Sequence, residues 1–548
     1  IGHGGIYTGG DHKGSIDVNA MAGDVILNAD VDRHGTNAGF AGSGNNTYAQ
    51  IGHGGIYSDG EIGAGTIEGV DYTTNMKVNA GGGIIGDAGD SASYSMIGHG
   101  GYTAQGTSAV TWTTPNYRYG GGENYTYRPG TRSGDIDVDA DGDIVFTGGD
   151  VDGDIAFVQI GHGGYEISAN PNSAFGDGHS GDIDVASANG GITFNAGKRL
   201  YDYAQIGHGG VRSYGNHGGD GADSRMDSDI SVQAWGDINF TSGTRTNSNA
   251  DARAFAMIGH GGWSSSFRDI QDIDSGGYAI LQPYGENGFN ADNSGRHPWV
   301  PFTTNPDGLA IMLGTGDLLE NSPGDLSGAA TLGTFKGDIT VRTTGTGDIN
   351  FHVANDADGS LIRNADESHV QIGHGGYRNF ADIEGTITVE SGGGIEFHAI
   401  QGTGDNNNSN SQGAYALLGH GGYESGGEFN GNITVTSVDT ILFKGADSAD
   451  GANVGFVQLG HGGFDSDDDH GQYKDAAKDA TGAQPATTND VGNSGDITVT
   501  VTAGDLEFLA GKDADTYAQL GHGGRSTRDS HSGDITVDVA GGIRFIAS

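Results

Sequence analysis

Short runs of alternating apolar and polar residues recur along the chain and predict β-strands. One run follows Gly-Asp and has the form Ile-x-Val, as in residues 183–185. A second follows within a few residues and has the form Ile-x-Phe-x-Ala, as in residues 192–196. The third ends in Ile/Leu-Gly-His-Gly-Gly, as in residues 517–524. A period of two is typical of strands with one buried face, and the Gly, Asp and Asn residues between the runs indicate turns.

The three runs recur together, and their repetition predicts the fold. The Gly-His-Gly-Gly segment occurs ten times at intervals of 41–63 residues, apart from one gap of 114 residues between His260 and His374. A degenerate copy with Thr315 in place of histidine lies inside that gap, so eleven copies are expected. We therefore predict an all-β fold, a parallel β-solenoid (β-helix) with about eleven coils of three short strands and variable loops. A β-propeller, which has a similar period, is the competing architecture.

Residues 1–548 are expected to form this single repetitive solenoid. Because the sequence starts and stops inside a repeat, it is expected to be part of a longer chain. Composition shifts towards proline, aromatic or acidic residues in three predicted loop excursions, residues 103–132, 264–335 and 465–493. Loops of solenoids often form a binding face. The side chains expected to contact a ligand there are Trp112, Tyr117, Tyr119 and Trp299.

The histidine of each repeat is a candidate for an internal ladder. It follows an inward-facing Ile or Leu by two positions, so it is expected to face inward and to stack from coil to coil about 4.8 Å apart. Neutral imidazole has one donor and one acceptor, which a backbone group or a neighbouring ring can satisfy. A metal-binding or proton-conducting array is the alternative. The predicted structural ladder comprises His3, His53, His99, His162, His208, His260, His374, His420, His461 and His522.

Aspartate precedes the first apolar residue of many predicted strands. Stacked coils would bring these like charges close together, so they require hydrogen bonds from turn amides or bound cations. Calcium suits carboxylate oxygens and flexible geometry, which makes it the candidate cofactor. The alternative is that aspartate caps turns and solvates the surface. The candidate calcium ligands are Asp135, Asp139, Asp141, Asp143, Asp150, Asp152, Asp154, Asp182, Asp496 and Asp534.

Composition excludes several classes of function. The chain carries 71 acidic and 25 basic residues, a net charge of −46, which argues against binding to nucleic acids and anionic membranes. No apolar run is long enough to insert into a membrane. The chain has no cysteine, which excludes disulfide scaffolds and thiolate metal sites. Because the coils are nearly identical and basic residues are scattered, no special catalytic site is expected, and we predict that the protein is not an enzyme.

The repeat in residues 181–185 and 190–197 resembles the shaft repeats of large bacterial surface proteins, the filamentous-haemagglutinin-like adhesins and autotransporter passengers. This resemblance implies a right-handed β-helix exported to the cell surface. We expect an extracellular structural subunit or segment of a filament, stalk or surface fibre. Its partner would be a second copy or a continuation of the same chain. A calcium-dependent adhesin that binds glycans through its aromatic loops is the alternative, and a polysaccharide-degrading β-helix enzyme is less favoured.

Overall fold

The fold is known from a computed structural model, and it is built from strands, with no helix among the described residues. The described residues are 1–6, 11–29, 47–56, 58, 62, 73–89, 93–102, 132–149, 155–165, 178–197, 199–213, 215, 217–218, 228–243, 253–263, 334–353, 368–379, 381–399, 414–445, 455–464, 466, 492–511, 516–527 and 530–547, together with the backbones of a few short strands named below.

The Ile-x-Val and Ile-x-Phe runs form two parallel sheets of ten strands each. Sheet 1 has the order β2 (Ile16–Ala20), β8 (Met76–Ala80), β15 (Ile136–Ala140), β20 (Ile183–Ser187), β24 (Ile230–Ala234), β33 (Ile339–Thr343), β38 (Ile387–Ser391), β43 (Ile433–Ser437), β47 (Ile497–Val501) and β50 (Ile535–Val539). Sheet 2 has the order β3 (Val25–Asn28), β9 (Ile84–Asp87), β16 (Ile144–Thr147), β21 (Ile192–Asn195), β25 (Ile238–Ser242), β34 (Ile349–Val353), β39 (Ile395–His398), β44 (Ile441–Lys444), β48 (Leu506–Leu509) and β51 (Ile543–Ile546).

Two further parallel sheets flank the Gly-His dipeptides and have nine strands each. Sheet 3 has the order β4 (Tyr48–Ile51), β10 (Ser93–Ile97), β17 (Ala156–Ile160), β22 (Tyr203–Ile206), β26 (Phe255–Ile258), β35 (His369–Ile372), β40 (Ala414–Leu418), β45 (Gly455–Leu459) and β49 (Tyr517–Leu520). Sheet 4 has the order β1 (Gly4–Ile6), β5 (Gly54–Ile56), β11 (Gly100–Tyr102), β18 (Gly163–Tyr165), β23 (Gly209–Val211), β27 (Gly261–Trp263), β36 (Gly375–Tyr377), β41 (Gly421–Tyr423) and β46 (Gly462–Phe464).

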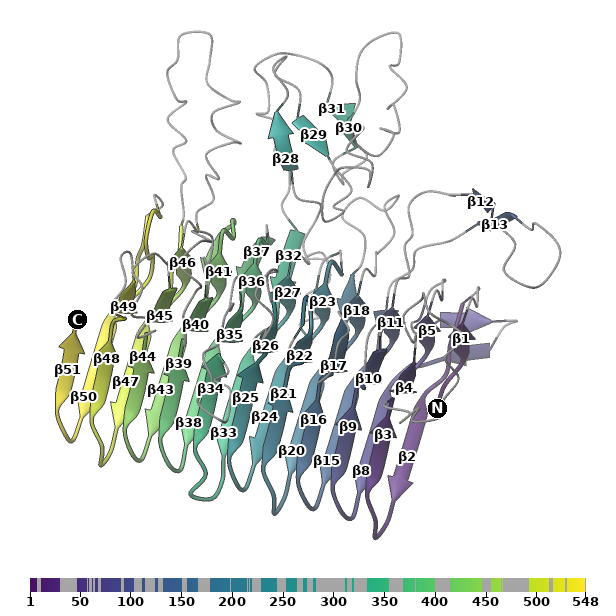
Figure 1. The fold of residues 1–548 in the computed structure, drawn as a ribbon, viewed down its shortest axis with the longest axis horizontal. Helices are drawn as coiled ribbons and strands as arrows, with labels where there is room; N and C mark the ends of the chain where they lie inside the picture. Colours follow the sequence, from purple (N-terminus) through teal and green to yellow (C-terminus); the bar gives the residue numbers. More distant parts are fainter. Residues whose placement is uncertain are drawn as a thin grey trace, which may run out of the picture.

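These four sheets make the molecule a parallel β-solenoid, as the sequence predicts. Each strand pairs with the equivalent strand of the next coil, so the coils stand side by side along a rod with the two termini at opposite ends (Figure 1). The short turns between sheets 1 and 2 lie along one edge of the rod (Figure 1). The third predicted strand differs from the expectation, because the structure divides it at the Gly-His dipeptide into a sheet 3 strand and a sheet 4 strand.

Smaller sheets complete the fold. Further parallel pairing occurs in short strands that directly precede strands of sheet 1, namely β14 (Arg132–Ser133) with β19 (His179–Ser180), and β32 (Gly333–Lys336), β37 (Ala381–Glu384) and β42 (Phe429–Asn430). Four antiparallel pairs are also described by their backbones, namely β6 (Gly65–Ile67) with β7 (Val70–Tyr72), β12 (Thr111–Thr113) with β13 (Asn124–Thr126), β28 (Ile270–Ile273) with β29 (Ala279–Leu281), and β30 (Ile311–Met312) with β31 (Leu318–Leu319).

The prediction of an extra coil within the 114-residue gap is wrong. Strand β27 pairs directly with β36, and β24 pairs with β33, so the coil of His260 stacks on the coil of His374. Thr315 of the degenerate copy lies outside the described residues. Sheets 1 and 2 therefore contain ten strands each, which corresponds to ten coils where about eleven are expected.

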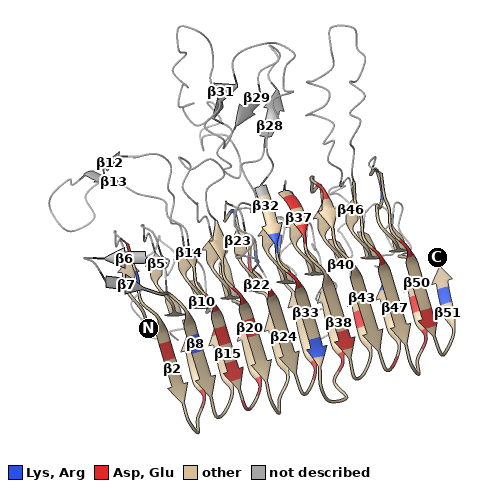
Figure 2. Ribbon diagram, turned by 180° about the vertical axis from the view of Figure 1, so that it is seen from behind, with Lys and Arg blue, Asp and Glu red and all other residues tan. Residues whose placement is uncertain are grey.

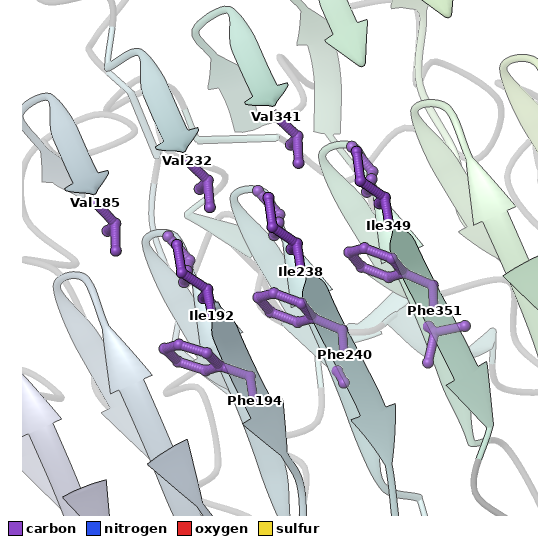
Figure 3. Packing of buried hydrophobic residues seen from close by; sticks show 14 of the residues in the cluster. Val185, Ile192, Phe194, Val232, Ile238, Phe240, Val341, Ile349 and Phe351 are labelled. Carbon is purple, nitrogen blue, oxygen red and sulfur yellow. The ribbon is translucent and has the colours of Figure 1, made fainter. Parts of the chain in front are cut away.

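Two hydrophobic cores share sheet 3 as a common wall. The first core lies inside sheets 1, 2 and 3, where Ile, Val and Phe side chains stack coil upon coil; Figure 3 shows Phe194, Phe240 and Phe351 in one such row. The ring centroids of these three phenylalanines are 5.1 and 4.9 Å apart. The second core lies between the other face of sheet 3 and sheet 4. It contains an aromatic row that includes Tyr94 and Phe157, 4.8 Å apart.

The outward faces of sheets 1 and 2 carry the polar half of the alternating pattern. Acidic residues lie on β2, β15, β20, β38 and β50, and basic residues lie on β8, β33 and β51 (Figure 2). Lys77 forms ion pairs with Asp137 and, at 3.8 Å, with Asp139 of the next coil. In the described part of the chain, no helix has the length and apolar character needed to cross a membrane.

Candidate functional site

The Gly-His-Gly-Gly corner between sheets 3 and 4 is the most regular polar feature of the structure. All ten predicted histidines stack in one column that runs through the rod. Neighbouring ring centroids are 4.6–5.0 Å apart and the ring planes are within 3–11° of parallel. Every ring from His53 to His461 is buried, whereas His3 is exposed and His522 is partly buried.

Both ring nitrogens of the nine histidines from His53 to His522 have backbone partners. Each Nδ1 from His53 to His522 accepts a hydrogen bond of 2.8–3.1 Å from the backbone N–H of the histidine one coil earlier. Each Nε2 lies 2.7–2.9 Å from a backbone carbonyl oxygen in the turn that leads into sheet 1. A carbonyl can only accept, so Nε2 carries the hydrogen and the rings are neutral.

Burial holds these rings in the neutral form. Desolvation lowers the pKa of His99 to about 3, because a charged imidazolium would lose its hydration inside the rod. Desolvation, followed by the neighbouring His99 ring, lowers the pKa of His162 well below its ordinary value. A metal ion would need the lone pair of Nδ1, which the backbone N–H of the preceding coil already occupies. The column therefore joins the corner of each coil to its own sheet 1 strand and to the next coil.

Glycine on both sides of the histidine allows coils to approach closely at this corner. Gly161 has φ +149°, and a Cβ atom there would lie 1.9 Å from the carbonyl oxygen of Gly207. Gly98 has φ +157°, and its Cβ would lie 1.7 Å from the carbonyl oxygen of Gly161. Any side chain at these positions would overlap the backbone of the next coil.

A row of glutamines on sheet 3 bonds to the Gly-His-Gly-Gly corner from the side of the second core. Gln159 donates from Nε2 to the carbonyl oxygens of Gly207 and Gly209, at 3.0 and 3.3 Å, and accepts at Oε1 from the Tyr203 hydroxyl at 3.1 Å. The sequence pattern places Gln50 and its equivalents outward, and they do point away from the first core. They are nevertheless buried, because sheet 4 and its aromatic residues cover that face. Reasoning from alternation alone misses this second core.

The aspartate rows connect coils along the outer edges of sheets 1 and 2. Before sheet 1, a carboxylate accepts the backbone N–H of the residue at the same position in the next coil: Asp135 from Asp182 at 3.2 Å, and Asp496 from Asp534 at 2.8 Å. Asp182 in turn accepts from the backbone of Asp229. In the turn before sheet 2, Asp143 accepts from the backbone N–H of Gly191 at 2.8 Å. These aspartates cap backbone groups from one coil to the next.

Of the remaining calcium candidates, the structure describes Asp139 and Asp141. Asp139 projects outward from β15 towards Lys77, and burial, followed by the charge of Asp137, raises its pKa. Asp141 lies in the turn after β15. Asp150, Asp152 and Asp154 lie outside the described residues. Among the residues that the structure describes, no group of three or more His, Asp or Glu side chains is placed to hold a metal ion.

The predicted ligand-binding aromatic residues are not placed by the structure. Tyr117, Tyr119 and Trp299 lie outside the described residues, and Trp112 is described only by its backbone in β12. Comparisons of the chain with protein-family models, with curated proteins and with solved structures found no match.

Proposed function

We propose that these coils form a stiff structural segment of an extracellular filament, stalk or surface fibre. The observation that supports the proposal most directly is the continuity of bonding along the rod. The four sheets, the histidine column and the aspartate caps all connect one coil to the next. Such bonding resists bending and local opening, because separating two coils breaks several rows of hydrogen bonds together.

The chemistry of the regular polar residues also favours a structural role. The column histidines from His53 to His522 use both ring nitrogens internally, and the aspartates before sheet 1 use a carboxylate oxygen in capping. Neither set is free to act on a substrate without breaking bonds between coils. The high negative charge keeps such rods soluble and separated from one another. Further coils, from a second copy or from the same chain, would extend the stack by the same strand pairing.

Electron microscopy of the purified chain, with and without a calcium chelator, tests this proposal. We expect filaments with a regular axial repeat, built from stacked coils about 4.8 Å apart. Filaments that fray when calcium is removed would add a role for calcium in assembly. Dispersed rods on the order of 50 Å long at high protein concentration, unchanged by the chelator, would contradict the filament proposal. That outcome would favour a surface-tethered binding shaft.

A further inference from the structure

The histidine column brings an unusual number of buried titratable rings into one line. We propose that this column is an acid-sensitive lock: protonation of its rings disconnects neighbouring coils, so that the solenoid opens at mildly acidic pH and closes again near neutrality. The proposal rests on the hydrogen-bond geometry of the coil stack. It does not depend on whether the rod belongs to an extracellular fibre.

The geometry makes protonation and coil contact mutually exclusive. In His208, Nε2 already donates to the carbonyl oxygen of Gly181 at 2.8 Å, so an added proton must go to Nδ1. That nitrogen accepts the backbone N–H of His162 at 3.0 Å. An imidazolium has two donors and no acceptor, so the backbone N–H of His162 would lose its partner inside the rod. The same contact recurs at every step of the column.

The charged and titratable neighbours of the column mostly repel an added positive charge, while the backbone carbonyl bonded to each Nε2 offsets only part of the cost of burial. The nearest titratable groups above and below each internal ring are other histidines of the column. From the adjoining elements, His12 faces His53, Arg132 faces His99 and His162, and His179 and His217 lie beside the column near His208. These neighbours all disfavour an added positive charge. The carboxylate of Asp496, next to His522, instead favours a positive charge on that ring.

The direction of the pH effect follows from the lowered pKa values. An unfolded histidine titrates near pH 6.5, whereas burial keeps the pKa of His208, His260 and His374 well below that value in the fold. Below about pH 6.5 the unfolded chain therefore binds more protons than the folded chain. The stability contributed by the neutral rings is complete above pH 6.5 and is lost as the pH falls. Each such ring reduces the folding equilibrium constant by up to about tenfold per pH unit.

Guanidinium unfolding of the whole chain at a series of pH values from 8 to 4.5 tests the lock. The unfolding midpoint should stay constant down to about pH 7, fall steeply below pH 6.5, and recover when the pH is raised again. Aspartate in an unfolded chain titrates near pH 4, well below this range, so a fall between pH 6.5 and pH 5 points to histidine. A midpoint that is constant from pH 7 to pH 5 would overturn the proposal.

A double variant assigns the effect to the column. Replacing His208→Gln and His260→Gln removes two titrating rings while keeping an amide donor and acceptor. The folding equilibrium constant should then fall less steeply with decreasing pH, the difference being a factor of up to about one hundred per pH unit. The matched control is His352→Gln with His398→Gln, two histidines on the outer face of sheet 2 next to Glu396. This control should not make the dependence shallower. An equal effect of both pairs would contradict a role for the column.

A measurement on the unaltered chain keeps the test decisive if the variant does not fold. Nitrogen NMR of labelled imidazoles distinguishes the neutral ring with hydrogen on Nε2 from the cation. We expect the column rings to remain neutral for as long as the β-sheet signal persists, and cations to appear only together with its loss. Column rings that become cationic while the sheets remain intact would show that the coils tolerate protonation, and the lock would be excluded.

Discussion

At the scale of single residues, the Gly-His-Gly-Gly corner requires glycine for steric reasons. We predict that Gly161→Ala lowers the free energy of unfolding by about 3 kcal/mol or more. The new Cβ would lie 1.9 Å from the carbonyl oxygen of Gly207, and the φ of +149° is unfavourable for alanine. The obstacle is backbone of the next coil, which cannot rotate away as a side chain could. Chemical denaturation of the purified variant measures the loss.

Gly23→Ala is the matched control for this substitution. A Cβ at Gly23 would meet no atom within 4 Å, and its φ is not in the left-handed region. We expect its free energy of unfolding to stay within about 0.5 kcal/mol of the parent chain. Similar stability of the Gly161 and Gly23 variants would mean that the coils do not approach each other as closely as the structure shows.

The aspartate caps lead to a second prediction at this scale. Asp338 accepts the backbone N–H of Thr386 in the next coil at 2.7 Å. Asp338→Ala should therefore lower the free energy of unfolding by about 1 kcal/mol, since it leaves that N–H without its acceptor. Asp338→Asn should cost about 0.5 kcal/mol or less, because an amide oxygen can replace the carboxylate, as Asn432 does for the backbone of Asp496.

Comparing these two variants also separates capping from cation binding. If Asp338 mainly held calcium, the asparagine and alanine variants would both lose stability, and only in the presence of calcium. If it mainly caps the next coil, the asparagine variant would match the parent chain with or without calcium. Thermal melts of both variants with and without a chelator supply the comparison.

At the scale of elements, alternation and repetition predict sheets 1 and 2 and the stacking of the histidines. Residues such as Ile183 and Phe194 alternate with polar neighbours, and this pattern is sufficient to assign their inward face. Alternation could not reveal the second core, because an outward-facing Tyr203 or Gln205 has the same pattern whether water or another sheet covers it. The division of the third strand also escapes the pattern, since it depends on glycine φ values that the sequence does not display.

Repeat spacing predicts the wrong number of coils at the long gap between His260 and His374, for a related reason. A degenerate motif near Thr315 fits the period, but period alone does not show that a segment enters the stack. The backbone N–H of His260 donates directly to Nδ1 of His374 at 2.8 Å, which leaves no room for a coil between them. Only the strand pairing reveals which repeats are neighbours.

Excision of the long insertion tests this arrangement. We predict that replacing residues 264–332 with a copy of residues 378–380, the short connection that follows β36, leaves the sheet stack intact. Strands β27 and β32 would then be joined as β36 and β37 are joined one coil later. The melting temperature should change by only a few degrees, and unfolding should remain cooperative. Loss of cooperative unfolding would contradict the direct stacking of these two coils.

At the scale of the whole molecule, each coil is an interchangeable unit, because equivalent residues meet at every interface. Deleting residues 162–207 removes one complete period and joins Gly161 to His208, so that Ile160 would meet Ile258 and Gly100 would meet Gly209. We predict a folded rod that is shorter by about 4.8 Å, with a modest loss of stability, as expected when a repeat protein loses one interface. Small-angle scattering gives the length, and denaturation gives the stability.

Deleting only residues 162–187 should instead unfold the neighbouring coils, because a sheet 2 strand would then follow a sheet 3 strand and every row would be out of register. Equal behaviour of the two deletions would show that the rows of histidine, glutamine and phenylalanine do not set the register of the rod.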